Sequence, residues 1–150
     1  MEVKRWRVFL DTSPLIGGVV SSTGAAREVL CLVEAGPIEL VISRQVLIEA
    51  DRNLSTKLPA VVPDYERLLK ALKPSVVEDP VPEAVKEARS VIHHNDAPIL
   101  AATRKANVDY LVNWNTKHFH TRSVREFVHF QVVTPGELLQ AFRRMLPSQL

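Results

Sequence analysis

"WRVFLDTSPLIGG", residues 6 to 18, is a short apolar run that breaks into Asp-Thr-Ser-Pro before it turns apolar again. A run of this length and composition predicts a buried strand over 6–11. Thr12 or Ser13 is then expected to cap a helix whose first position suits Pro14. The stretch therefore predicts a strand, a polar turn and a helix in immediate succession.

The same alternation of strands and helices continues along the chain. The further expected elements are a helix over 23–36, a strand over 38–43, a helix over 43–54, helices over 64–73 and 82–94 with a short strand between them, a helix over 96–107, strands over 108–114 and 129–134, and a helix over 134–146. Most of these strands are continuous apolar runs. This pattern predicts a three-layer α/β/α sandwich with a central, mainly parallel sheet.

Composition sets broad bounds on the protein. Its 150 residues suit a single domain over 1–150, and 46% hydrophobic with 24% charged residues excludes a disordered chain. A net charge of +2 gives no argument for or against nucleic acid. The single cysteine, Cys31, excludes an intramolecular disulfide and is expected to be a buried structural thiol. With no signal-peptide or membrane-spanning run, we expect a soluble cytoplasmic protein with no membrane contact.

Three acids and an amide stand where a parallel sheet places its functional crevice, beyond the carboxyl ends of the strands. Asp11 follows the first strand, and Glu49 lies in the helix that follows the second. Glu49 has apolar neighbours, so it should have a polar partner. Asp96 is expected to cap a helix, and a cap residue still has a free oxygen for a cation. Asn115 follows the strand over 108–114.

Such oxygen donors, drawn from four segments, are typical of a site for a hard divalent cation, Mg²⁺ or Mn²⁺. A cation of this kind can activate water and neutralise a phosphodiester during its hydrolysis. Taken alone, Asp11 followed by Thr12 and Ser13 is equally typical of turn and cap chemistry. The spacing of the acids by itself is therefore a weak signal.

Four segments resemble the successive blocks of a PIN domain, in the family's order. They are "RVFLDTSPLIG" (7–17), "VISRQVLIEADRNL" (41–54), "NDAPILAATRKANVDYLVNWNTKHF" (95–119) and "VVTPGELLQ" (132–140). The second and third are similar to the PilT-like, VapC-type subgroup. The resemblance implies a three-layer fold with a parallel sheet and a Mg²⁺- or Mn²⁺-dependent endoribonuclease. It also implies the toxin of a type II toxin–antitoxin pair, with a small antitoxin as partner and a homodimer as the common state.

Residue by residue, the resemblance makes Asp11, Glu49 and Asp96 the first three acids and the metal ligands. The family's fourth acid usually ends a Thr-x-Asp run, and here that run reads Asn113-Trp114-Asn115. Asn115 thus completes the catalytic set as a neutral ligand, which should weaken the cation site. We expect one tightly held cation and a second only with substrate phosphate present.

Several further residues are candidates for smaller roles. Lys117 and Arg122 either position the RNA backbone or are solvated surface charges. Trp114 either stacks on a base or covers the core as a strand-end residue. The accessory site residues are Thr12, Ser13, Asn113 and His118, the last as a ligand for Mn²⁺ or a neighbour of the scissile phosphate.

Other chemistries fit the sequence less well. A zinc site among His93, His94, His118 and His120 is disfavoured because adjacent histidines rarely bind one ion. A haloacid-type phosphatase needs a second aspartate where Ser13 stands, and no G-x-G-x-x-G run marks a dinucleotide site. The serious rival is a PIN-like module that binds RNA or a partner without cutting, and the missing fourth acid is its main support.

Overall fold

Five strands form one sheet in the computed structural model, which describes residues 4–146. The strands are β1 (Trp6–Leu10), β2 (Ile38–Ser43), β3 (Ser75–Val77), β4 (Tyr110–Val112) and β5 (Gln131–Val133). Their order is β3-β2-β1-β4-β5, and every neighbouring pair is parallel. The predicted parallel sheet is therefore confirmed.

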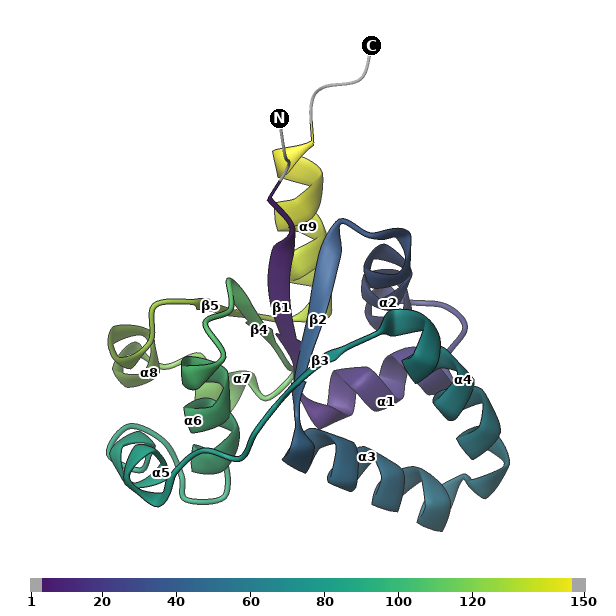
Figure 1. The fold of residues 1–150 in the computed structure, drawn as a ribbon. Coiled ribbons are helices and arrows are strands. Elements are labelled where there is room, and N and C mark those ends of the chain that lie inside the picture. The colour runs from purple at the N-terminus through teal and green to yellow at the C-terminus, as the bar shows by residue number, and fades with distance from the viewer. Residues whose placement is uncertain (1–3, 147–150) are drawn as a thin grey trace.

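Helices cover both faces of the sheet. They are α1 (Thr12–Val20), α2 (Ala25–Ala35), α3 (Arg44–Lys57), the 3-10 turn η1 (Pro59–Val61), α4 (Val62–Leu72), α5 (Pro82–Ala88), α6 (Ala97–Lys105), α7 (Thr116–Phe119), α8 (Arg122–Phe127) and α9 (Pro135–Met145). Figure 1 shows α1 to α4 on one side of the sheet and α5 to α8 on the other, and α9 packs against α2. This is the three-layer α/β/α arrangement that the sequence predicts.

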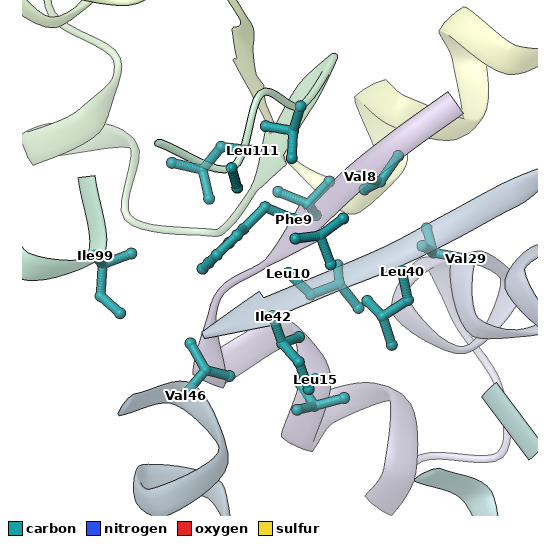
Figure 2. Close-up of a cluster of buried hydrophobic side chains, with 14 of the residues drawn as sticks. Val8, Phe9, Leu10, Leu15, Val29, Leu40, Ile42, Val46, Ile99 and Leu111 are labelled. Carbon is teal, nitrogen blue, oxygen red and sulfur yellow. The ribbon is translucent and has the colours of Figure 1, made fainter. Parts of the chain in front are cut away.

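The core is centred on β1 and β2, which lie in the middle of the sheet. Val8, Phe9 and Leu10 are consecutive and each is at most 1% exposed. Since successive side chains of a strand point to opposite faces, both faces of β1 must be covered. Figure 2 shows these residues between Leu40 of β2 and Leu111 of β4. The continuous apolar run at the start of the chain thus marks the central strand.

Three local predictions need correction. Asp11, and not Thr12 or Ser13, caps α1, because its carboxylate accepts a hydrogen bond from the Thr12 N–H. The helix expected to reach residue 94 ends at Ala88, and tight turns then lead to α6. Cys31 is exposed. The buried stripe of α2 consists of Ala26, Val29, Leu30 and Val33, and position 31 falls outside it.

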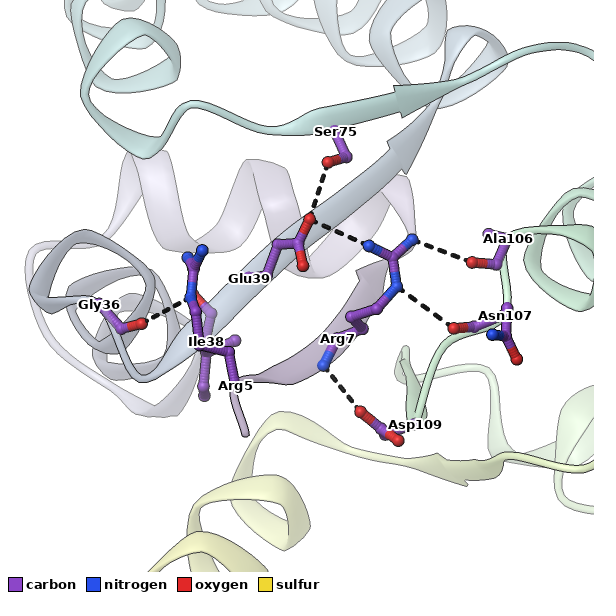
Figure 3. Close-up of polar contacts among 9 residues, drawn as sticks. All are labelled: Arg5, Arg7, Gly36, Ile38, Glu39, Ser75, Ala106, Asn107 and Asp109. Carbon is purple, nitrogen blue, oxygen red and sulfur yellow. Dashed lines mark hydrogen bonds and ion pairs between the residues drawn. The ribbon is translucent and has the colours of Figure 1, made fainter. Parts of the chain in front are cut away.

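A polar network ties the strands together at their amino ends, shown in Figure 3. The Arg7 guanidinium donates to Glu39 Oε1 at 3.0 Å and to the carbonyls of Ala106 and Asn107. The Arg7 N–H donates to Asp109 Oδ2 at 2.8 Å, and Ser75 Oγ donates to Glu39 Oε1 at 2.9 Å. Each carboxylate at this end therefore has a partner within the chain.

Among the described residues, no single helix has the length and apolar composition to cross a membrane; α1 and α2 meet those criteria only as a pair, bent by 89°.

Candidate active site

The switch point of the sheet lies between β1 and β4. The chain runs from β1 outward to β2 and β3, and then returns to the other side of β1 with β4. In an open parallel sheet, a ligand crevice forms beyond the carboxyl ends of the strands at such a point. Asp11 directly follows β1 and Asn113 directly follows β4, and the Asp11 N–H donates to the Val112 carbonyl at 3.1 Å. The topology therefore places an acid and an amide side by side.

Asp11 carries the most perturbed carboxyl group of the site. Its pKa is raised to about 6, mainly by burial and additionally by the charges of Glu49 and Asp96, while a hydrogen bond from the Thr12 N–H at 2.7 Å acts in the opposite direction. The two charge effects mean that the carboxylates of Glu49 and Asp96, which come from two other segments, lie within electrostatic range of Asp11. The sequence predicts that these three acids converge on one point, and Asp11 lies within reach of the charges of the other two.

Glu49 is half-buried on α3 and is held by two hydrogen bonds. The Thr12 hydroxyl donates to its Oε2 at 2.8 Å, and Gln45 Nε2 donates to its Oε1 at 2.9 Å. The expected polar partner of Glu49 is therefore Thr12, the residue after Asp11. This contact ties the start of α1 to α3 and orients Glu49 toward the end of β1.

Asp96 stands at the N-cap position of α6, but its side chain makes no capping hydrogen bond. Its Oδ2 instead lies 2.9 Å from Nδ1 of His118, on the loop after β4. The Asn115 amide nitrogen lies 3.4 Å from the same histidine nitrogen. Since a neutral Nδ1 that donates to Asp96 cannot also accept from Asn115, the shorter contact is the hydrogen bond. His118 and Asn115 therefore border the site on the Asp96 side.

Asn113 is 1% exposed, and neither its amide nitrogen nor its amide oxygen has a hydrogen-bond partner among the described residues. It lies close enough to Asp11 to lower the pKa of that carboxyl slightly, without the geometry of a full hydrogen bond. A buried amide without partners is unfavourable unless water or a ligand satisfies it. Asn113 therefore points to a polar occupant beside Asp11.

A divalent cation fits the donor set and charge of this site. Among residues 4–146, no lysine or arginine forms an ion pair with Asp11, Glu49 or Asp96. Within the same residues, no group of three His, Cys, Asp or Glu side chains is already arranged to hold a metal ion. Glu49 is turned to Thr12 and Asp96 to His118, so metal binding would require both carboxylates to rotate from these partners.

Comparison with known proteins identifies the family. The model described as "PIN domain" matches residues 7–117. The chain belongs to the PIN domain family. No curated protein sequence matches it significantly.

Two solved structures share the fold of this PIN domain. PAE2754 from Pyrobaculum aerophilum is similar with a TM-score of 0.60 and 16% identity, over 92% of this chain and 90% of that one. VapBC2 from Rickettsia felis, whose crystal structure is of the protein bound to a DNA fragment from its promoter, has a TM-score of 0.62 and 17% identity. That match covers 85% of this chain and 96% of the other. At such identity the likeness concerns the fold.

The basic residues that the sequence suggested lie at the edge of the PIN domain. Lys117 is exposed on α7, and Ser13 is exposed at the start of α1. Arg122 forms an ion pair with Glu126 one turn along α8, which offsets its charge. Zinc ligation by the histidines gains no support, because the His93 and His94 rings pack against each other in a tilted pair and His118 contacts Asp96. Neither Lys117 nor Arg122 forms an ion pair with Asp11, Glu49 or Asp96 among the described residues.

One face of α3 next to the acids was missed from the sequence. A groove of about 450 Å³ begins at Ser13 and Glu49 and is also lined by Arg52, Asn53, Thr56 and Lys57. These residues follow Glu49 at intervals of three, four, seven and eight, which is the spacing of a single helix face. That spacing is the sequence signal from which this face of α3 could have been predicted, but it is informative only when Glu49 is known to lie at the crevice.

Proposed function

We propose that this PIN domain is a Mg²⁺- or Mn²⁺-dependent endoribonuclease, and the toxin of a type II toxin–antitoxin pair. PIN domains are generally nucleases, and family membership supplies the reaction class. The observation that carries the proposal for this chain is the raised pKa of Asp11 beside Glu49 and Asp96, with no basic side chain paired to any of the three among the described residues. Three such carboxylates favour a divalent cation from solution.

Bound there, the cation would supply charge to offset the phosphodiester and a lowered pKa for the attacking water. Asp11 and Asp96 are the residues that would hold it, because they flank the switch point from two sides. Glu49, fixed by Thr12, would orient the attacking water. The amides of Asn113 and Asn115 can donate hydrogen bonds to a phosphate oxygen, a role that a carboxylate in those positions could not fill.

The partners follow from the same reading. VapBC2 of Rickettsia felis is, by its description, bound to promoter DNA. For this chain we infer a small antitoxin as partner, which would block the crevice. We also infer a homodimer and a cytoplasmic location, where the protein would encounter RNA. A pull-down of the protein with the product of a neighbouring open reading frame would test the antitoxin.

The nuclease proposal is tested by cleavage. Purified protein is incubated with single-stranded and structured RNA in Mg²⁺, Mn²⁺ or EDTA, beside an Asp11→Asn variant. Cleavage is expected only with a cation and only with Asp11 intact. Cleavage that survives either EDTA or the substitution would belong to another mechanism or to a contaminant, and the proposal would be rejected.

The second candidate is an RNA- or partner-binding module with weak or no nuclease activity. The observation in its favour is the pair of amides, Asn113 and Asn115, where the family usually has a hydroxyl and an acid. With three acids instead of four, the site holds less negative charge for a second cation. RNA that binds without being cut, in either cation, would support this candidate over the nuclease.

A further inference from the structure

Trp114 is the most exposed aromatic residue beside the candidate site. Its side chain is 49% exposed, although it lies only two residues beyond the end of β4. Its chain neighbours are Asn113, buried against Asp11, and Asn115, which borders His118. A tryptophan that merely covered the core would have most of its surface removed from water. Its exposure therefore needs another explanation.

Gly17 sets the position of the indole ring. A Cβ atom built on Gly17 would lie 2.8 Å from Cη2 and 3.1 Å from Cζ3 of Trp114. The ring edge therefore rests directly on the backbone of α1, the helix that Asp11 caps. Glycine inside a helix is unfavourable by about 1 kcal/mol relative to alanine. The absence of a side chain at Gly17 is what allows the close approach that fixes the ring beside the crevice.

The groove along α3 supplies a path for a charged polymer that passes this ring. Ser13 lines the start of the groove and lies one helical turn before Gly17 on the same face of α1. Arg52 and Lys57 line the groove, and neither forms an ion pair with any residue in the described part of the chain. Basic side chains in a groove and an exposed aromatic face beside it are the two features with which proteins bind single-stranded nucleic acid.

We propose that Trp114 stacks on an unpaired base of single-stranded RNA whose backbone follows the α3 groove past Arg52 and Lys57. The proposal rests on the proposed function, because the acids beside Trp114 would act on the neighbouring phosphodiester. Double-stranded RNA buries its base faces in the helix, so stacking on Trp114 selects single-stranded or looped substrate. Trp114 is thus a substrate-binding residue, and Gly17 positions it.

The chain contains an internal control, its second tryptophan. Trp6 packs against Tyr110 with ring centroids 4.9 Å apart and against Phe142 at 5.4 Å. It belongs to β1 at its amino end, away from the crevice. Trp6→Phe leaves Trp114 as the sole indole fluorophore, and Trp114→Phe leaves Trp6. The two variants report on the two ends of the sheet separately.

The test combines fluorescence with an independent binding measurement. Both single-tryptophan variants are made in the Asp11→Asn background, so that RNA is expected to be bound but not cut. They are titrated with a short oligouridine, and binding is followed in parallel by the anisotropy of a labelled copy. We expect saturable quenching of Trp114 and none of Trp6. In the same background with both tryptophans kept, Trp114→Ala should weaken binding about 5- to 100-fold, while Trp114→Phe, which retains an aromatic face, should weaken it less than about threefold.

Gly17→Ala provides a positioning test, since the new methyl group would displace the ring while helix propensity improves. RNA affinity should fall although thermal stability does not. Bound RNA with unquenched Trp114, or unchanged affinity in Trp114→Ala, overturns the proposal. The proposal is also overturned if Trp114 fluorescence is quenched by raising the protein concentration without RNA, because Trp114 would then lie in a contact between two protein molecules. Absence of any RNA binding rejects the proposed function as well, whereas quenching by RNA in a protein that never cleaves retains the stacking and rejects only the nuclease.

Discussion

The acidic side chains at the two ends of the parallel sheet have different kinds of bonding partners. At the amino end, Glu39 accepts from Arg7 and Ser75, and Asp109 accepts from the Arg7 N–H and lies 3.6 Å from the Lys4 ammonium. At the carboxyl end, Asp11 and Glu49 accept only from uncharged donors within residues 4–146. Both ends hold carboxylates of similar burial.

The difference separates acids whose charge is compensated within the fold from acids that we propose bind a cation. A carboxylate paired with an arginine has its charge compensated in the folded chain, so its removal should affect stability. The charges of Glu49 and Asp96 raise the pKa of the Asp11 carboxyl, so its ionised form is unfavourable in the folded chain alone, and such groups are typical of functional sites. The following substitutions compare the two ends directly, from the largest expected effect to the smallest.

The largest effect is expected on cleavage, with the two glutamates as a matched pair. Glu49→Gln should lower the rate of RNA cleavage about 100-fold or more, because it removes the carboxylate proposed to orient water. Glu39→Gln, at the amino end, should keep the rate within about twofold of the parent protein once its lower stability is allowed for. Single-turnover cleavage of a labelled RNA measures both. Equal losses in the two variants would mean that the contrast between the ends has no catalytic meaning.

The second prediction concerns stability, and the substitution that should lower it lies at the amino end of the sheet. Arg7→Met removes the guanidinium that joins Glu39 to the carbonyls of Ala106 and Asn107. Because Glu39 is then left half-buried without its cation, the free energy of unfolding should fall by about 1–3 kcal/mol. Urea denaturation followed by circular dichroism measures the change. Glu49→Gln is the control and should leave the free energy of unfolding nearly unchanged, since Thr12 and Gln45 can still bond to the amide.

Sequence alone predicts the sheet, and the place of Asp11 directly after its central strand, because both depend on short-range patterns. Continuous apolar runs such as Val8, Phe9 and Leu10 identify buried parallel strands, and Asp11 stands directly after one. The partners of the acids are not predictable in the same way. That Asp96 bonds to His118, 22 residues later, and not to the backbone of its own helix depends on where the loop after β4 lies.

Exposure is the other property that the sequence could not supply. Cys31 stands in an apolar run and Trp114 stands between two asparagines after a buried strand, and both are exposed. For Cys31, helix phase decides, because the buried stripe of α2 passes on either side of it. For Trp114, a tertiary contact decides, because Gly17 on another helix leaves room for the ring edge. Periodicity shows which residues share a face, but the packing of elements determines which face meets water.

The third prediction concerns pH and isolates Asp11. Its folded pKa is raised to about 6 from 3.8, so ionisation of Asp11 is harder in the folded chain. The contribution of the protonated Asp11 carboxyl to folding stability is fully present below pH 3.8, and it is lost as the pH rises through about 6. In EDTA, Asp11→Asn should therefore be more stable than the parent protein by up to about 3 kcal/mol at pH 7 and little or no more stable at pH 4. Thermal unfolding across this range measures the difference. A difference independent of pH would place its cause in packing.

The smallest expected effect is on cation affinity, and it asks whether the amides border the cation directly. Asn115→Asp restores the charge that the family usually has, and should tighten Mn²⁺ binding about three- to tenfold, as measured by isothermal titration calorimetry. Asn107→Asp adds the same charge at the amino end, where Arg7 already neutralises Glu39, and should leave Mn²⁺ affinity unchanged. If both variants bind Mn²⁺ equally well, the gain reflects net charge. If only Asn115→Asp increases Mn²⁺ affinity, the loop after β4 borders the cation site directly. The two neutral amides of that loop would then explain a lower Mn²⁺ affinity than a site with a fourth carboxylate would have.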